Sequence, residues 1–541
     1  MTATPWWRGA TIYQIYPRSF ADSDGDGVGD LPGILAKVDY LSWLGVDAVW
    51  LSPFYPSPMV DFGYDVSDYT GVDPLFGGLA DFDALVSALH AHGIRVIVDF
   101  VPNHSSDRHA WFVESKAART ARRRDWYVWA DPRPDGGPPN NWESYFGGSA
   151  WELDPATSQY YLHTFHRTQP DLNWDNGEVR QAMADALRFW LARGVDGVRV
   201  DVLWILAKDR ARRDNPPNDR WRPGEPYWHR QVRRYSEDQP EAHDHARFIR
   251  GVVDEFPDRV MIGEVVLPAE RAVAYYGAAL DEAHLPLNFG LADLAPWSPR
   301  TFHATVTGYL RSLPPGAEPN WFLGNHDFER VASRLGQRTA RLAQVLMLTL
   351  PGTALLYYGD ELGLPNGHIP PALVSDPQAV AFPERSRESA RTPMQWDLTE
   401  HAGFGAATPW LPVSRTGGEW TVARQRDDPA SMLSLVRALL RLRADDPAVA
   451  HGDYAPLPVP DPRVLAFTRS AGHHRVTVVA NFSDDVVPTP APAGEHRVTL
   501  VSSAGNHDPR TLQPKEAKVL GTAVQDWEET RRIAHARRRT T

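Results

Sequence analysis

Cysteine is absent from the chain, and this absence excludes disulfide bonds and metal sites built on thiolates. Long apolar runs are absent too, since no stretch reaches the ~18 consecutive apolar residues of a membrane-spanning helix. The first residues, MTATPWWRGA, lack the basic region followed by an apolar region that marks a secretory signal. The last two absences predict a cytoplasmic protein that has no membrane as a partner, whereas the lack of cysteine says little about compartment.

Positive charge is also scarce. Lysine and arginine number 56 against 68 aspartates and glutamates, which leaves a net charge of −12. Because phosphate backbones require a basic surface, this balance argues against nucleic acid as the main partner. The content of 42% hydrophobic and 23% charged residues is that of an ordinary globular protein. Tryptophan, in contrast, occurs 20 times, which fits either core packing or an aromatic-lined sugar cleft.

Short apolar runs alternate with helical patterns along most of the chain. The first run ends at Pro17, and others follow at 46–53, 95–101, 196–202, 259–265, 284–290, 320–327 and 353–361. Amphipathic helices such as EVRQAMADALRFWLARG lie between most of these runs. The alternation indicates a parallel sheet covered on both faces, and about eight units predict an α/β fold of the (β/α)8 TIM-barrel type. A doubly wound open sheet is the competing fold, but no GxGxxG motif follows any of the runs.

Two interruptions divide this repeat. Residues 104–172 are rich in proline, glycine and aromatic side chains and are too long for a plain loop, so they predict a small inserted domain after the third strand. Beyond residue 450, the runs VLAFTRS, HRVTVVANF and HRVTLVSS alternate with a period of two, which predicts an antiparallel β-sandwich. We therefore expect a barrel formed by 1–103 and 173–449, an inserted domain at 104–172, a β domain at 450–525 and a charged tail at 526–541.

The stretch DSDGDGVGD, from Asp22 to Asp30, contains four aspartates in nine residues. An EF-hand loop would carry a bidentate Glu at its twelfth position, but counting from Asp22 that position is Gly33. The preceding segment also reads as a strand rather than a helix. The residues therefore fit a hard cation in a frame other than the EF-hand, and an acidic surface turn stays open at this point.

Four short segments carry the polar residues expected at strand ends, where barrel active sites lie. One such residue has a plain explanation, because a carboxylate at a strand end often caps the next helix. Together, however, the segments predict a cluster of carboxylates, an arginine and histidines around one barrel mouth, which capping does not require. The segments are VDFVPNHSS with Asp99, Asn103 and His104, GVRVDV with Arg199 and Asp201, MIGEVV with Glu264, and LGNHD with His326 and Asp327.

In this order, the four segments resemble the signature regions of the α-amylase superfamily of glycoside hydrolases. The resemblance covers nearly the whole chain. PWWRGATIYQIYPRSF, DFGYDVSDY, PNNWESYFGGSAWELD, QPDLNWDN and RTPMQWD are similar to its α-glucosidase and oligo-1,6-glucosidase branch rather than to endo-acting amylases. Two departures stand out: Val198 replaces the usual Phe, and residues 204–209 vary within the branch, which leaves linkage preference open.

The resemblance implies a retaining mechanism with two carboxyls across the scissile bond, which such enzymes hold ~5–5.5 Å apart. Asp201 is then the nucleophile that forms a covalent glucosyl-enzyme, and Glu264 is the acid/base. Asp327 would bind the 2- and 3-hydroxyls of the sugar. Arg199 should keep the nucleophile ionised, because it lies two residues away on the same strand face. His104 and His326 would bind hydroxyls of that glucose; neither has the spacing of a zinc ligand.

The resemblance also implies a wall that ends the sugar chain, since exo-action requires one. The Asp of DFGYD, Asp61, would pair with the Arg of RTPMQWD, Arg391, and clamp the terminal glucose. Tyr64 would form a stacking platform. Phe146 and Phe165 would line the next subsite, although both phenylalanines could equally well pack the inserted domain against the barrel.

Similar oligo-1,6-glucosidases carry a calcium ion in the first loop after a strand, away from the catalytic carboxylates. The resemblance therefore implies structural Ca2+ held by the carboxylates of Asp22, Asp24, Asp26 and Asp30 and by the carbonyl of Val28. Carboxylates this close repel one another without a cation. Magnesium and an empty, solvated loop are the alternatives.

We thus expect an exo-acting, retaining α-glucosidase that cleaves short α-glucosides and transfers glucose, with a small-molecule oligosaccharide as its partner and a monomer or weak homodimer as its state. Val202, next to the nucleophile, should flank the leaving-group subsite and favour α-1,6 bonds. A glucosyl-transferring or isomerising enzyme, of the sucrose isomerase or trehalose synthase type, is the alternative. A non-catalytic relative of transporter heavy chains is disfavoured, because the three carboxylates are kept and no anchor is present.

Overall fold

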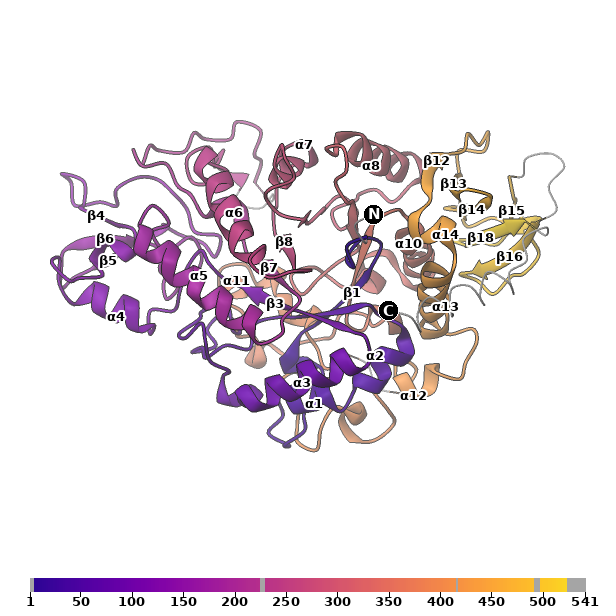
Figure 1. Ribbon diagram of the computed structural model, residues 1–541, viewed down its shortest axis with the longest axis horizontal. Helices are drawn as coiled ribbons and strands as arrows, with labels where there is room; N and C mark the ends of the chain where they lie inside the picture. Colours follow the sequence, from indigo (N-terminus) through magenta and orange to yellow (C-terminus); the bar gives the residue numbers. More distant parts are fainter. Residues whose placement is uncertain (1–3, 224–228, 415–416, 491–496, 523–541) are drawn as a thin grey trace.

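The computed structural model describes residues 4–223, 229–414, 417–490 and 497–522. The predicted charged tail at 526–541 lies outside the described residues. A central barrel has the small β4–β6 sheet on one side and the C-terminal β domain on the other (Figure 1). None of the helices in the described part of the chain has the length and apolar character that crossing a bilayer demands.

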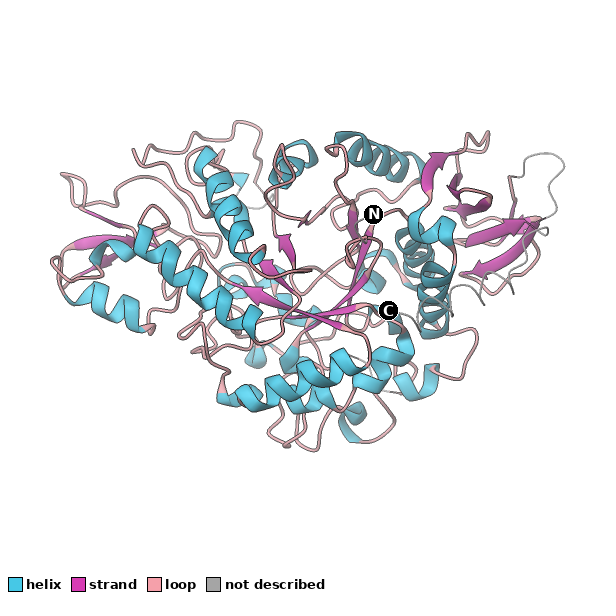
Figure 2. Ribbon diagram, viewed as in Figure 1, coloured by secondary structure: helices cyan, strands magenta, loops and turns pink. Residues whose placement is uncertain are grey.

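Eight strands form the barrel, and the neighbouring strands pair in parallel, as the apolar runs predicted. Their order is β10-β11-β1-β2-β3-β7-β8-β9. They appear as the magenta arrows at the centre of Figure 2. The strands are β1 (Thr11–Ile15), β2 (Ala48–Leu51), β3 (Arg95–Phe100), β7 (Gly197–Val200), β8 (Val260–Gly263), β9 (Leu285–Pro286), β10 (Asn320–Phe322) and β11 (Thr353–Tyr357).

A side chain, rather than a strand ladder, connects β9 to β10. The Asn320 amide donates to the Pro286 carbonyl at 2.7 Å, and the Asn288 backbone N–H donates to the Asn320 side-chain oxygen at 3.0 Å. The Asn288 amide in turn donates to the Asn320 carbonyl at 3.2 Å. These bonds satisfy backbone groups beside the two-residue strand β9 and link β9 to β10, where the strand ladder of the barrel is interrupted.

Helices cover the outside of the barrel, and their bounds follow the amphipathic segments read from the sequence. Apolar residues at helical spacing give each long helix one buried face. The helices are α1 (Leu31–Leu35), α2 (Val38–Leu44), α3 (Leu79–Ala91), α4 (Ala110–Ala117), α5 (Gly177–Ala192), α6 (Pro240–Val253), α7 (Ala269–Ala272), α8 (Pro299–Ser312), α9 (Val331–Leu335), α10 (Gln337–Thr349), α11 (Pro377–Ala381), α12 (Val422–Gln425), α13 (Met432–Asp445) and α14 (Pro447–His451).

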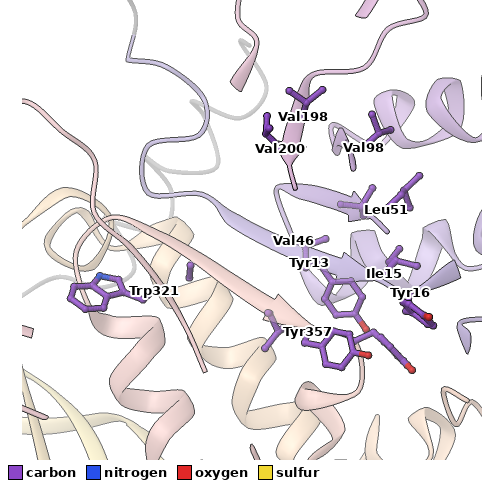
Figure 3. Close-up of a cluster of buried hydrophobic side chains, with 14 of the residues drawn as sticks. Tyr13, Ile15, Tyr16, Val46, Leu51, Val98, Val198, Val200, Trp321 and Tyr357 are labelled. Carbon is purple, nitrogen blue, oxygen red and sulfur yellow. The ribbon is translucent and has the colours of Figure 1, made fainter. Parts of the chain in front are cut away.

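The alternation of side chains along each strand separates two cores and positions the polar groups. Val98 and Val198 belong to the large cluster that packs under the helices, whereas Ile97 and Ile262 belong to a second, smaller cluster. Figure 3 shows part of the large cluster, with Leu51, Val98, Val198 and Val200 on neighbouring strands. Because alternate residues share a face, the polar side chains in register with the smaller cluster point into the barrel: Gln14, Asp99, Arg199, Asp201 and Glu264.

Two smaller β units flank the barrel. An antiparallel sheet of order β4-β6-β5, made by Trp129–Ala130, Gln159–Leu162 and Trp151–Asp154, lies within the predicted inserted domain. The C-terminal unit has a five-stranded antiparallel sheet, β12-β13-β14-β18-β16, beside a two-stranded one, β15-β17. Its strands are β12 (Asp453–Pro456), β13 (Val464–Ala471), β14 (His474–Asn481), β15 (Val487–Pro488), β16 (Arg497–Ser502), β17 (Thr511–Leu512) and β18 (Ala517–Thr522). The predicted fold class is confirmed, while the domain boundaries stay predictions.

Candidate active site

One arginine joins the carboxylates at the barrel mouth. Arg199 Nη1 lies 2.5 Å from Asp201 Oδ1 and 2.8 Å from Asp99 Oδ1. Its other terminal nitrogen, Nη2, lies 2.9 Å from Glu264 Oε2. Because Asp201 and Glu264 contact the two ends of one planar guanidinium, their carboxyls are close neighbours, an arrangement compatible with the ~5–5.5 Å separation of retaining glycosidases.

Burial shifts the protonation of these carboxyls. It raises the pKa of Asp201 well above its ordinary value, although the Arg199 guanidinium lowers the pKa and the Glu264 carboxyl raises it further. Burial also raises the pKa of Glu264, again against Arg199 and with Asp327 adding to the increase. A raised pKa suits a carboxyl that must donate a proton near neutral pH. The 2.5 Å contact with Arg199 favours the ionised form at Asp201 rather than at Glu264.

Asp327 has the opposite electrostatics. Burial would raise its pKa, but His326, Arg387 and Arg391 together lower it below its ordinary value. Its Oδ1 lies 2.9 Å from Arg391 Nη2 and 3.2 Å from Arg387 Nη1, and its Oδ2 lies 3.2 Å from His326 Nε2. Asp327 therefore stays ionised and available to accept hydrogen bonds from a ligand.

The expected pairing of Asp61 with Arg391 is wrong. Asp61 Oδ1 instead lies 2.7 Å from Arg387 Nη2, four residues earlier, and this arginine also contacts Asp376 at 2.7 Å. Arg391 donates to the His326 carbonyl and to Asp327. The two arginines flank a short 3-10 helix, Arg387–Ala390, so the turn directs one toward Asp61 and the other beneath Asp327.

The two histidines are buried and neutral at neutral pH. Burial lowers the pKa of His104 to about 4 and that of His326 to about 3. The Gln14 amide lies 2.8 Å from His326 Nδ1, and the Tyr64 hydroxyl lies 2.7 Å from His326 Nε2 and 3.0 Å from Asp99 Oδ2. Because the Gln14 amide nitrogen can only donate, Nδ1 of His326 is the acceptor and we assign the ring proton to Nε2, which faces both Tyr64 and Asp327.

A cavity of about 250 Å³ opens above these groups. It is polar around the carboxylates and aromatic where the inserted domain meets the barrel, which is the composition of a small-ligand site. Ten of the expected site residues line it, whereas Arg199 and Arg391 act from beneath. Its wall consists of Asp61, Tyr64, His104, Tyr145, Phe146, Phe165, Asp201, Val202, Trp204, Glu264, Val266, His326, Asp327, Gln378 and Arg387.

The sequence predicted a strand that extends to Val202, but β7 ends at Val200. Val202 adopts φ 41°, in the left-handed region that a β-branched residue rarely enters. Its backbone N–H donates to Glu264 Oε2 at 3.0 Å. The strained turn thus connects the segment after the nucleophile to the acid/base carboxyl, as strain at functional sites often does.

Sequence reasoning missed several lining residues. Gln378 lies on the five-residue helix α11 and Arg387 begins a short 3-10 helix, and both segments are too short for a periodic pattern to mark these residues. Tyr145 and Trp204 also line the pocket, and nothing in the sequence distinguishes them from core aromatic side chains. Arg387 has a partial signal, because SRESARTPMQWD contains two arginines four residues apart.

In the acidic loop, oxygen atoms of three aspartates, Asp22, Asp24 and Asp30, lie within 4.8 Å of one another. Asp26 is not part of this group; its carboxylate accepts the Val28 backbone N–H at 2.7 Å. Asp30 also caps α1, and Asp22 accepts two backbone N–H groups of its own loop. Three close carboxylate oxygens fit the ligand chemistry of Ca2+, so calcium stays a prediction with a ligand set narrower than expected.

Known proteins share this chain's sequence over most of its length. A family model described as the alpha amylase catalytic domain matches residues 14–452. The chain is 42% identical over 497 residues to a probable alpha-glucosidase of Rhizobium meliloti, covering 89% of this chain and 90% of that protein. It is 37% identical over 517 residues to an oligo-1,6-glucosidase of Parageobacillus thermoglucosidasius, covering 88% and 91%.

Solved structures share its fold. The crystal structure of the alpha-glucosyl transfer enzyme XgtA superposes with a TM-score of 0.90 at 41% identity, covering 96% of this chain and 100% of that one. The trehalulose synthase MutB from Pseudomonas mesoacidophila superposes with a TM-score of 0.88 at 35% identity, with the same coverage of 96% and 100%. These neighbours include enzymes that transfer or isomerise as well as relatives named for hydrolysis.

Proposed function

The chain belongs to the α-amylase family of glycoside hydrolases, and on that premise we propose that it is an exo-acting α-glucosidase that retains anomeric configuration. Its substrates are short α-glucosides such as maltose and isomaltose, and it releases α-glucose from their non-reducing ends. The observation that carries this proposal is the contact of Asp201 and Glu264 with opposite ends of the Arg199 guanidinium.

In the first step, Asp201 attacks the anomeric carbon while Glu264 protonates the leaving oxygen. Arg199 supports the ionised nucleophile. Both contacts of the Glu264 carboxyl, with Arg199 and with the Val202 N–H, fall on Oε2, which leaves Oε1 without a hydrogen-bond partner among the described residues. Oε1 is therefore the atom that carries the proton. In the second step, Glu264 takes a proton from water, which displaces Asp201.

Exo-action is supported by the charged wall of the pocket. Arg387 bridges Asp61, Asp327 and Asp376 at 2.7 to 3.2 Å and is itself buried in this network. Such a wall blocks extension of the sugar chain beyond one glucose, and its carboxylate oxygens accept hydrogen bonds from the hydroxyls of that glucose. A cavity of about 250 Å³ suits one such ring and part of a second.

A transferring or isomerising activity is the second candidate. Similarity to XgtA and to a trehalulose synthase favours it, because water and sugar acceptors compete for the same glucosyl-enzyme. We include transglucosylation in the proposed function and treat hydrolysis as the main outcome, since the named sequence relatives are glucosidases.

Incubation with maltose, isomaltose, sucrose and trehalose, followed by identification of the products, tests the proposal. We expect glucose as the main product from maltose and isomaltose, with minor longer sugars. Conversion of sucrose into an isomer with little free glucose would instead establish the isomerising activity. Failure to act on any of the four would refute the α-glucosidase.

We further propose that the acidic loop binds structural Ca2+ through Asp22, Asp24 and Asp30. The loop precedes α1, and its last residue, Asp30, caps the N-terminus of that helix. A cation would supply only charge balance and rigidity there, and no catalytic step involves it.

A further inference from the structure

Four aromatic side chains line the part of the catalytic pocket where the inserted domain meets the barrel. Tyr145, Phe146 and Phe165 come from the inserted domain, and Trp204 comes from the 3-10 turn Leu203–Ile205 after β7. The Phe165 ring stacks on Tyr145 with centroids 5.4 Å apart and lies 5.8 Å from Phe146. The three rings of the inserted domain therefore form one continuous surface, and Trp204 lines the same pocket from the barrel side. We refer to the four side chains as the aromatic wall.

Glu237, which lies outside the pocket lining, forms hydrogen bonds to two of these aromatic side chains. Glu237 Oε1 accepts the Tyr145 hydroxyl at 2.5 Å, and Oε2 receives a longer contact from Trp204 Nε1 at 3.4 Å. Arg233 lies 3.4 Å from the same carboxylate, and its guanidinium sits 4.1 Å from the centre of the Tyr145 ring. The Glu237 side chain is only 12% exposed. One buried carboxylate thus fixes two aromatic rings that belong to different parts of the chain.

These bonds determine what the wall offers to a ligand. The polar atoms of Tyr145 and Trp204 are engaged by Glu237, so the wall presents mainly ring surface, alongside Val202 and Val266. Ring surface binds the apolar face of a pyranose and orients it without demanding one hydroxyl pattern. The charged groups that would recognise the glucosyl unit are Asp61, Asp327 and Arg387, and the Arg387 guanidinium borders the wall, 5.3 Å from the centre of the Phe146 ring.

We propose that Glu237 is a positioning residue that holds Tyr145 and Trp204 as the acceptor platform, and that this platform sets how the glucosyl-enzyme divides between water and a sugar acceptor. The inference rests on the proposed retaining mechanism. In the transfer step, an acceptor hydroxyl attacks the anomeric carbon and the bond to Asp201 breaks. The proton of the acceptor hydroxyl passes to the Glu264 carboxylate, and Asp201 leaves as a carboxylate.

The test compares transfer with hydrolysis from one common intermediate. With p-nitrophenyl α-glucoside as donor, p-nitrophenol release reports formation of the glucosyl-enzyme. Free glucose and disaccharide then report its two fates in the presence of concentrated maltose. Tyr145→Phe removes only the hydroxyl bonded to Glu237, and Glu237→Leu removes the anchor. Glu237→Gln keeps a partner for both rings, because its amide oxygen can accept from Trp204 Nε1 while its NH2 group donates to the Tyr145 hydroxyl. Glu270→Leu, at an exposed glutamate on α7, is the matched control.

We expect the transfer-to-hydrolysis ratio to fall about threefold in Tyr145→Phe and about tenfold in Glu237→Leu, as loss of one hydrogen bond and of ring stacking implies. Glucosylation without acceptor should fall by a smaller factor than the transfer-to-hydrolysis ratio does, because the glucosyl-binding groups of the pocket are unchanged in these variants. Glu237→Gln and Glu270→Leu should keep the wild-type ratio. Thermal melting of each variant identifies any that fails to fold. If Glu237→Leu does not fold, Tyr145→Phe still tests the proposal.

An unchanged ratio in Tyr145→Phe and in folded Glu237→Leu would overturn the platform. An equal loss of glucosylation and transfer would also overturn it, because that is the signature of general damage to the pocket. If the wild-type protein itself released no p-nitrophenol, the proposed function would fail first, and the two failures are therefore distinguishable.

Discussion

Arg387 and Arg391 lie four residues apart and carry the same charge, yet they serve different neighbours. Arg387 contacts Asp61, Asp327 and Asp376, whereas Arg391 contacts Asp327 and the His326 carbonyl. At the scale of single residues, the assignment of the glucose clamp therefore depends on which arginine reaches Asp61. In the structure, the arginine that contacts Asp61 is Arg387.

Arg387→Lys tests this assignment. Lysine keeps the charge but cannot span Asp61, Asp327 and Asp376 as a planar guanidinium does. Loss of one to two charge-assisted bonds should lower kcat/KM for maltose about 10- to 100-fold. Steady-state kinetics measures this change in kcat/KM, and Arg338→Lys, at an exposed position of α10, is the control. A kcat/KM within about twofold of wild type would show that Arg387 does not bind the substrate.

Val202→Thr tests linkage preference at the residue beside the acid/base. Valine and threonine are nearly isosteric, so the change adds one hydroxyl at the leaving-group side of the pocket. One hydrogen bond is worth ~1 kcal/mol, or several-fold in relative rate. We expect the kcat/KM ratio of maltose to isomaltose to rise several-fold. An unchanged ratio would transfer the role to the loops at 208–228 and 362–390.

The elements around the site were predictable to different degrees. The eight strands were read correctly because each is a buried apolar run, and alternation within them places Asp99, Arg199 and Asp201 on the inner face. The run at 284–290 gives only the two-residue β9. In contrast, the segment with Arg387 and the loop with Glu237 follow no period, and their contacts join residues up to 326 positions apart. Such contacts depend on tertiary packing, which local patterns do not encode.

The acidic loop is the element whose prediction concerns a metal. Removal of calcium with EDTA should lower the melting temperature, and added Ca2+ should restore it, because three carboxylates repel one another without a cation. Asp24→Ala should abolish this dependence, since Asp24 belongs to the close group. Asp26→Ala is the matched control and should retain it. Equal calcium sensitivity of wild type and Asp24→Ala in a melting assay would exclude the proposed site.

At the scale of the whole molecule, folding stability depends on buried ionisable groups outside the pocket lining. Burial raises the pKa of Asp360 to about 7, although Arg330 opposes this at a distance of 3.8 Å. Because the folded pKa exceeds the unfolded one of ~3.9, the neutral carboxyl favours folding at low pH. That contribution is lost as the pH rises through 7.

Asp360→Asn removes this dependence. The free energy of unfolding of the variant, relative to wild type, should therefore increase between pH 5 and pH 8, by about 3 kcal/mol at most. Urea denaturation at the two pH values measures the difference for both proteins. A difference that stays constant, or that decreases toward pH 8, would contradict a raised pKa at this position.

The central claim concerns stereochemistry, because a nucleophile at Asp201 and an acid/base at Glu264 require two inversions at the anomeric carbon. Proton NMR during the first turnovers of p-nitrophenyl α-glucoside reads the anomer of the released glucose before mutarotation mixes the two forms. We predict that α-glucose appears first and that an Asp201→Asn control releases none. If β-glucose appears first, the enzyme inverts configuration, and the assignment of Asp201 as a covalent nucleophile is wrong.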